Sequence, residues 1–143
     1  MAIADFSHPS LQSLPLSINI STRQLDHVDQ FISDVTQVAE HTGRRCENVR
    51  LELAETAAIQ TYKHALNKLK SIGFGLALDD FGTGYSSLSV LKNMPFDYAK
   101  LDNSFIQNLF RENSPNDDGN VGVVNAFYSL CHELNIKTIA EGV

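Results

Sequence analysis

The stretch FGLALDD at residues 74–80, followed directly by FGTG at residues 81–84, indicates the fold class. Leucines alternate with small residues in its first half, and such alternation is typical of a β-strand. The strand ends on two acidic residues and a glycine-containing turn, after which residues 86–92 favour a short helix. A strand that passes through a turn into a helix is the repeating unit of α/β proteins, which place functional side chains at the carboxyl ends of their strands.

The same order of strand and helix recurs on both sides of this stretch. Hydrophobic periodicity predicts strands at 16–21, 49–55, 74–80, 98–102 and 136–143. It predicts helices at 22–42, 62–72, 86–92 and 121–134, a helical turn at 105–109 and an exposed polar loop at 111–120. Repeated strand–helix units imply a mostly parallel sheet with helical crossovers. Five such strands fit either an open sheet or part of a barrel that closes with eight.

Composition and charge narrow the functional classes. The 143 residues fit one domain, and 43% hydrophobic with 20% charged residues is typical of a globular chain. The net charge of -6 argues against binding to duplex nucleic acid, which relies on lysine and arginine. We identify no signal peptide and no segment long enough to span a membrane, and two cysteines are too few for a disulfide framework. These features predict a cytoplasmic protein.

Alternation along the strands assigns side chains to two faces. Four of the predicted strands carry one apolar face and one face of small or polar residues. An ordinary doubly wound sheet is apolar on both faces, whereas the inner face of a barrel turns polar near its catalytic mouth. The pattern therefore favours a partial barrel, and the inward-facing polar residues near the strand ends are Asn19, Glu52, Asp79 and Lys100.

These side chains form an oxygen-rich set without sulfur, which suits hard cations such as Mg²⁺ or Mn²⁺. Alternation places Asp80 off the Asp79 face, so Asp80 is a candidate ligand for a bridging or second metal. Lys100 could steady a phosphate or a metal-bound hydroxide, and its structural alternative is a salt bridge to Asp79 or Asp102. Glu141, at the end of the fifth predicted strand, could act as a general base.

Several segments resemble the bacterial EAL domains, a family of cyclic di-GMP phosphodiesterases. The central match is DDFGTGYSSL at residues 79–88. Other matching segments follow in the family's order, namely NIS at 19–21, ELAE at 52–55, KLD at 100–102 with SF at 104–105, and AEGV at 140–143. The resemblance covers nearly the whole chain from residue 16 onward, so we expect an N-terminal extension at 1–15 and a partial EAL-like domain at 16–143.

The resemblance implies a TIM-like barrel that hydrolyses one phosphodiester of cyclic di-GMP with the help of Mg²⁺ or Mn²⁺. The positions that match the family's metal ligands are Asn19, Glu52, Asp79 and, for the second metal, Asp80. Lys100 matches the lysine that holds the attacking water or the phosphate, and Glu141 matches the late glutamate of the catalytic site. Glu55 matches the glutamate that stabilises the loop after Asp80.

The chain also departs from the family pattern. The Glu-Ala-Leu tripeptide, whose glutamate is a metal ligand, is missing, and the last strands of the family are not present. We therefore expect about five of eight barrel strands, a weak or inactive phosphodiesterase, and a homo-oligomer that covers the open edges of the barrel. Two alternatives stay open: an enzyme completed by a second subunit, and a non-catalytic module that binds cyclic di-GMP or a protein. A phospho-receiver domain is a third, although its acidic pair belongs on the first strand.

Overall fold

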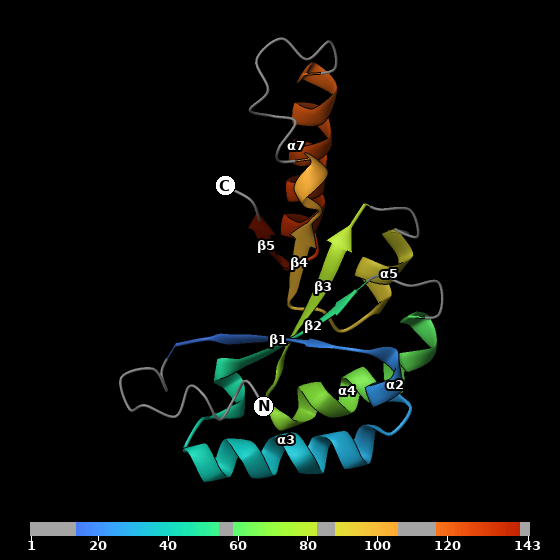
Figure 1. Ribbon diagram of the computed structural model, residues 1–143. Coiled ribbons are helices and arrows are strands. Elements are labelled where there is room, and N and C mark those ends of the chain that lie inside the picture. Colours follow the sequence, from blue (N-terminus) through green and yellow to red (C-terminus); the bar gives the residue numbers. More distant parts are fainter. Residues whose placement is uncertain (1–13, 55–58, 83–87, 106–116, 141–143) are drawn as a thin grey trace.

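A five-stranded parallel sheet forms the centre of the protein, whose computed structural model describes residues 14–54, 59–82, 88–105 and 117–140 (Figure 1). Each strand pairs in parallel with the strand that follows it in the chain. The strands are β1 (Leu16–Ile20), β2 (Val49–Ala54), β3 (Gly75–Phe81), β4 (Tyr98–Leu101) and β5 (Lys137–Ala140). The predicted strands are therefore confirmed, with ends that differ by a few residues and with residues 141–143 outside the described part.

The spatial order of the strands equals their order in the sequence, β1-β2-β3-β4-β5. Crossovers between parallel strands are right-handed, so a sheet that grows in one direction carries all its connecting helices on one face. That is the arrangement of a barrel wall, and the expectation of a partial barrel is confirmed. The phospho-receiver alternative is wrong, because the flavodoxin-like fold of receivers has the strand order 2-1-3-4-5.

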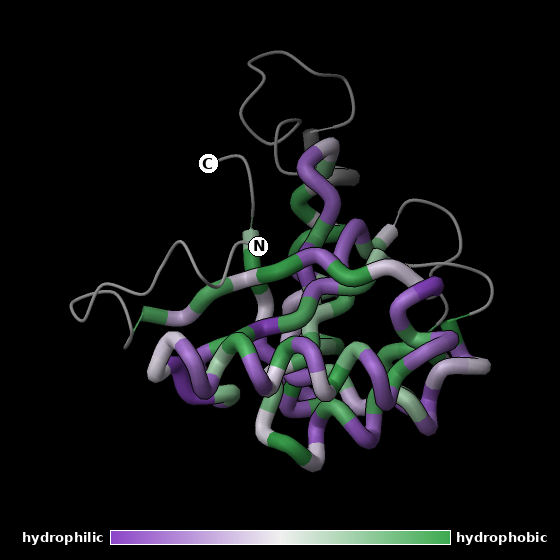
Figure 2. The backbone as a smooth tube through the Cα atoms, turned by 60° about the horizontal axis from the view of Figure 1, so that its bottom comes forward, coloured by the Kyte–Doolittle hydropathy of each residue, from purple (hydrophilic) through white to green (hydrophobic). Residues whose placement is uncertain are grey.

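The helices lie on the apolar side of the sheet and have amphipathic sequences (Figures 1 and 2). They are α2 (Thr22–Leu25), α3 (Val28–Thr42), α4 (Lys63–Ile72), α5 (Leu88–Asn93) and α7 (Asp117–Glu133). Two glycines, Gly43 and Gly73, follow α3 and α4 in the left-handed conformation and end these helices. None of the helices among the described residues has the length and apolar character of a bilayer-spanning segment.

Two sequence predictions are wrong in detail. The single helix expected at 22–42 is interrupted after Leu25, where His27 has φ -123° and ψ 47°. The break lets the buried Leu25 end one short helix while the hydroxyl of Tyr62 donates a hydrogen bond of 2.9 Å to Asp26 Oδ1. The polar loop expected at 111–120 is helical from residue 117, and acidic residues there favour a helix N-terminus.

The hydrophobic core lies between the outer face of the sheet and the helices. Alternate residues of β2 and β3 supply the sheet side, and the inner faces of the helices supply the other. The side chains with no more than 2% exposure in this layer include Leu51, Leu53, Leu76, Leu78, Leu66, Leu69 and Cys131. Burial raises the pKa of the Cys131 thiol to about 11, so this cysteine stays protonated and unreactive at neutral pH.

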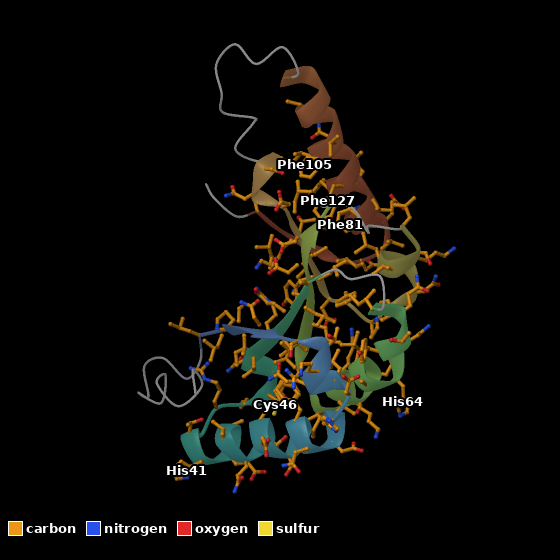
Figure 3. All side chains as sticks on the ribbon, turned by 45° about the vertical axis from the view of Figure 1, so that its right-hand side comes forward. His41, Cys46, His64, Phe81, Phe105 and Phe127 are labelled. Carbon is orange, nitrogen blue, oxygen red and sulfur yellow. The ribbon has the colours of Figure 1, made fainter. Side chains whose placement is uncertain are left out.

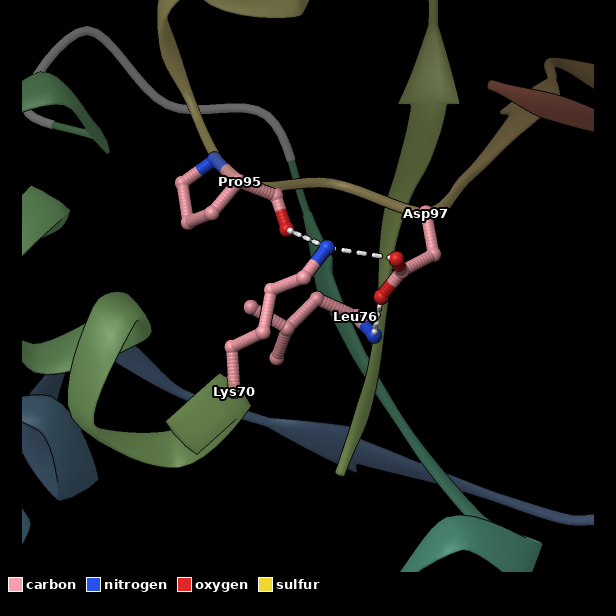
Figure 4. Close-up of polar contacts among 4 residues, drawn as sticks. All are labelled: Lys70, Leu76, Pro95 and Asp97. Atoms are coloured by element: carbon pink, nitrogen blue, oxygen red, sulfur yellow. Dashed lines mark hydrogen bonds and ion pairs between the residues drawn. The ribbon is translucent and has the colours of Figure 1, made fainter. Parts of the chain in front are cut away.

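Asp97, just before β4, ties the amino ends of three strands together (Figure 4). Its Oδ2 accepts a hydrogen bond of 3.1 Å from the backbone N–H of Leu76 in β3. Its Oδ1 pairs with Nζ of Lys70 from α4 at 2.5 Å, and its carbonyl accepts from the N–H of Lys137 in β5 at 2.9 Å. Since Asp97 also donates its own N–H to the carbonyl of Leu76, the register of β3, β4 and β5 is fixed at this end of the sheet.

The packing predicts a large difference between two leucine truncations. Leu66 on α4 is fully buried, whereas Leu88 at the start of α5 is 64% exposed. We expect Leu66→Ala to lower the free energy of unfolding by about 3 kcal/mol, because it leaves a cavity in a packed core. Leu88→Ala should lower it by less than about 0.5 kcal/mol. Urea denaturation followed by circular dichroism measures both, and equal losses would contradict the assignment of the core.

Candidate functional site

Three charged side chains from adjacent strands meet near the carboxyl ends of the sheet. Nζ of Lys100 on β4 lies 2.7 Å from Oε2 of Glu52 on β2 and 3.0 Å from Oδ1 of Asp79 on β3. The side chains of Lys100 and Glu52 are only 6% and 8% exposed, and that of Asp79 is 18% exposed. Charged groups are rarely buried to this degree unless they are paired, and here each carboxylate shares the same ammonium.

Strand register explains why these residues face each other. Leu51 and Leu53 on either side of Glu52 point into the helical layer, so Glu52 points to the opposite, inner face. Asn19 of β1 is in register with Glu52 and therefore lies beside it on that face, exposed to solvent. The predicted shared face is thus confirmed for Glu52, Asp79 and Lys100 by their contacts and for Asn19 by its register.

An irregularity in β3 shapes the acidic end of the site. Leu78 pairs with Ala99 and Phe81 with Leu101, so β3 has one residue more than β4 between these two pairs. Asp80 takes up the extra length in the left-handed region, with φ 55°, and its N–H donates a hydrogen bond of 3.0 Å to Asp79 Oδ1. Such bulges re-aim side chains next to functional sites. Strict alternation therefore does not hold at Asp80, and its role as a metal ligand stays a prediction.

The electrostatic partner of Lys100 was only partly predictable. The expected salt bridge to Asp79 is confirmed, whereas the contact with Glu52 was not anticipated, although both residues were assigned to one face. Asp102 instead accepts hydrogen bonds from the hydroxyl and, at 2.9 Å, the backbone N–H of Ser104. These two hydrogen bonds, first the one from the Ser104 hydroxyl and then the one from its N–H, hold the pKa of the Asp102 carboxyl below its ordinary value.

The donor chemistry of the site suits a hard divalent cation. Glu52 and Asp79 present carboxylate oxygens that already flank a positive charge, and Asn19 adds an amide oxygen on the same face. Within residues 14–54, 59–82, 88–105 and 117–140, no group of three or more His, Cys, Asp or Glu side chains could hold a metal ion. The predicted residues Glu55 and Glu141, and the turn at 83–87, lie outside the described residues.

Some polar features of this face were missed by sequence analysis. The guanidinium carbon of Arg50 lies 3.9 Å from the centre of the Tyr98 ring, and Nζ of Lys137 lies 5.5 Å from it. Gly75 lies next to the ring, since a Cβ there would be 3.6 Å from Tyr98 Cε2. Asn103 Oδ1, just after β4, is buried without a hydrogen-bond partner. Arg50 of β2 and Tyr98 of β4 meet across Gly75 of β3, so their contact depends on how the three strands align and not on alternation within one strand.

An aromatic cluster supports the turn that follows the acidic pair. The rings of Phe81 and Phe127 lie 5.0 Å apart, and Figure 3 shows Phe105 beside them along α7. These rings border an apolar pocket of about 320 Å³ that also contacts Gly82. Gly82 has φ 105°, and a Cβ at this position would lie 2.8 Å from Cε2 of Phe105. The backbone after Asp79 and Asp80 therefore depends on a glycine for both its conformation and its space.

The amino-acid sequence matches the family model of the EAL domain over residues 2–143. The chain belongs to the EAL domain family. The match agrees with the resemblance carried by the acidic pair and its glycine turn, and EAL domains of known structure share its barrel architecture.

Relatives that are similar in sequence are longer than this chain. An uncharacterized signaling protein of Caulobacter vibrioides is 38% identical over 133 residues, which are 91% of this chain and 16% of that protein. The cyclic di-GMP phosphodiesterase NbdA of Pseudomonas aeruginosa is 30% identical over 92% of this chain and 16% of its own length. The chain therefore spans about a sixth of the length of these two relatives.

A solved structure of a bacterial protein is also similar. BlrP1 of Klebsiella pneumoniae, in its complex with manganese and cyclic di-GMP, has a TM-score of 0.85 and 28% sequence identity. The similarity covers 99% of this chain and 36% of that one. This likeness places the five strands of this EAL domain chain within a TIM-like barrel fold.

The turn after the acidic pair predicts opposite effects for two glycine substitutions. Gly82→Ala should lower the free energy of unfolding by more than about 1 kcal/mol, because alanine is strained at φ 105° and its Cβ meets Phe105. Gly122→Ala is the matched control, since Gly122 is helical and a Cβ there meets nothing within 4 Å. It should raise stability by about 0.5–1 kcal/mol. Thermal denaturation tests both, and a neutral Gly82→Ala would contradict the strained turn.

Proposed function

We propose that this chain binds cyclic di-GMP together with a divalent cation at the carboxyl ends of β1 to β4. The observation that carries the proposal is the meeting of Glu52, Asp79 and Lys100 from three adjacent strands in one largely buried cluster. Parallel α/β folds bind ligands at this end of the strands. The name of the relative NbdA and the ligands of the BlrP1 complex support the choice of ligand.

Within this proposal, each residue has a chemical task. Glu52, Asp79 and Asn19 would hold the cation, and Asp80, the residue after Asp79, would serve a second one. Such cations would supply neutralisation of the phosphodiester charge and activation of water. Lys100 contributes a positive charge to the phosphate or the attacking water, and Glu55 and Glu141 keep the roles that the family resemblance assigns them.

We further propose that hydrolysis by the chain on its own is slow or absent. The described residues bring together only two carboxylates around one ammonium, which is a sparse ligand set for a two-metal phosphodiesterase. A non-catalytic protein that binds cyclic di-GMP is therefore the second candidate. Both candidates require the same pocket, and they differ only in whether linear dinucleotide accumulates.

Binding and turnover can be tested on the 143-residue chain. Calorimetric titration with cyclic di-GMP in the presence of Mn²⁺ should show binding, and chromatography after incubation should show little linear product. Asp79→Asn should weaken binding by about tenfold or more, because it removes a charged ligand oxygen. Asp29→Asn, in an exposed pair with Lys68 at 2.9 Å, is the matched control and should bind normally. Equal binding by both variants would contradict the proposed site.

We also propose that the chain self-associates when it is made alone. The edge strands β1 and β5 of the sheet carry half-exposed isoleucines, Ile18 and Ile139, and among the described residues no further strand pairs with their outer edges. An exposed parallel edge of this kind is prone to pair with another strand. A second copy supplies such strands and covers the inner face.

Sedimentation velocity tests the association. We expect the 143-residue chain to sediment as a dimer or larger assembly at micromolar concentration. A charge placed on an edge at an exposed position, as in Ser17→Lys on β1, should shift the distribution toward monomer. Ser71→Lys, at an exposed position of α4 away from the sheet edges, controls for the added charge alone. A stable, folded monomer of the unmodified chain would contradict the proposal.

A further inference from the structure

The ammonium of Lys100 lies between the two carboxylates to which the proposed function assigns the cation. Its Nζ contacts Glu52 Oε2 at 2.7 Å and Asp79 Oδ1 at 3.0 Å. These distances are typical of charge-assisted hydrogen bonds. The oxygens that would face a bound cation therefore already face a positive charge that belongs to the protein.

We propose that Lys100 is a built-in counter-cation that competes with the divalent ion for Glu52 and Asp79. This inference rests on the proposed function and adds how binding of the divalent ion to the site is controlled. While the site holds no divalent ion, Lys100 keeps the two carboxylates together. When the carboxylates take up such an ion, Lys100 withdraws from at least one of them.

The charges of the cluster support an exchange of one cation for another. Two carboxylates and one ammonium leave a single net negative charge, so Lys100 halves the charge that attracts a metal ion. Without Lys100, two neighbouring carboxylates with 8% and 18% exposure would repel each other in a poorly solvated position. Lys100 therefore relieves this repulsion. Another cation must displace the same contacts in order to bind, which lowers its affinity for the site.

The surroundings of Lys100 allow it to move away. Its four-carbon stem is flexible, and its compact ammonium forms rotatable hydrogen bonds, so it can release one acceptor and keep another. Asp79 is the more exposed of the two partners, so the cluster is open to solvent on that side. A buried salt bridge is not in itself required for stability, since apolar replacements are often as stable, and the location at the carboxyl ends of the strands points to a ligand instead.

Removal of the lysine provides the test. In calorimetric titrations of the 143-residue chain with Mn²⁺, Lys100→Met should bind about tenfold more tightly than the unmodified chain, because the competing charge is gone. Lys68→Met is the matched control: it removes a lysine from the exposed pair with Asp29 and should leave the affinity unchanged. A purely structural role for Lys100 predicts the reverse result, a loosened site with weaker binding.

A measurement on the unmodified chain covers the case in which Lys100→Met does not fold. With ¹³C-labelled lysine, the Cε resonance of Lys100, assigned through Lys100→Arg, should shift as Mg²⁺ is added, while that of Lys68 stays constant. An unshifted Lys100 resonance at saturating Mg²⁺ would overturn the inference. Mn²⁺ affinity that is equal or weaker in Lys100→Met would overturn it as well, yet leave the proposed function standing. A lack of Mn²⁺ binding by every variant would overturn both.

Discussion

The need to neutralise a buried ammonium constrains the arrangement of the inner face. Lys100 is 5% exposed, and a charge in such a position is strongly unfavourable without close partners. Its partners come from two other strands, so β2, β3 and β4 must keep the register in which Glu52 and Asp79 reach it. A slip of one residue in any of these strands would turn one side chain toward the helices and leave the others unpaired. The contacts of the site therefore require this strand register.

The bulge in β3 shows how local strain serves this arrangement. Asp80 adopts a left-handed conformation that non-glycine residues seldom take, and Gly82 follows with φ 105°. Such strained backbone conformations persist where the surrounding packing holds them in place. Here the cluster of Phe81, Phe105 and Phe127 provides that packing. The aromatic rings lie on the helical side of the sheet, so α7 stabilises the turn that follows Asp79, a member of the charged cluster.

The sequence predicts the order of the elements and the face of each strand, because both follow from local periodicity. The inward position of Glu52 and Lys100 follows from alternation with leucines and alanine alone. Three features depend on long-range geometry and could not be predicted: the bulge at Asp80, the break in the helix after Leu25, and the stacking of Arg50 on Tyr98. Predicting each of them requires knowing which residues of different elements lie opposite one another. Alternation within a single strand does not give this information.

Asp97 fixes β3, β4, β5 and α4 at the amino ends of the strands, whereas the charged cluster lies near their carboxyl ends. Structural integrity and ligand chemistry are thereby assigned to separate ends of the same scaffold. A related protein in which Glu52 and Asp79 are replaced would still keep the alignment of β3, β4 and β5 at their amino ends. Loss of catalysis during evolution need not entail loss of the domain, and the scaffold would remain available for a new task such as sensing or tethering.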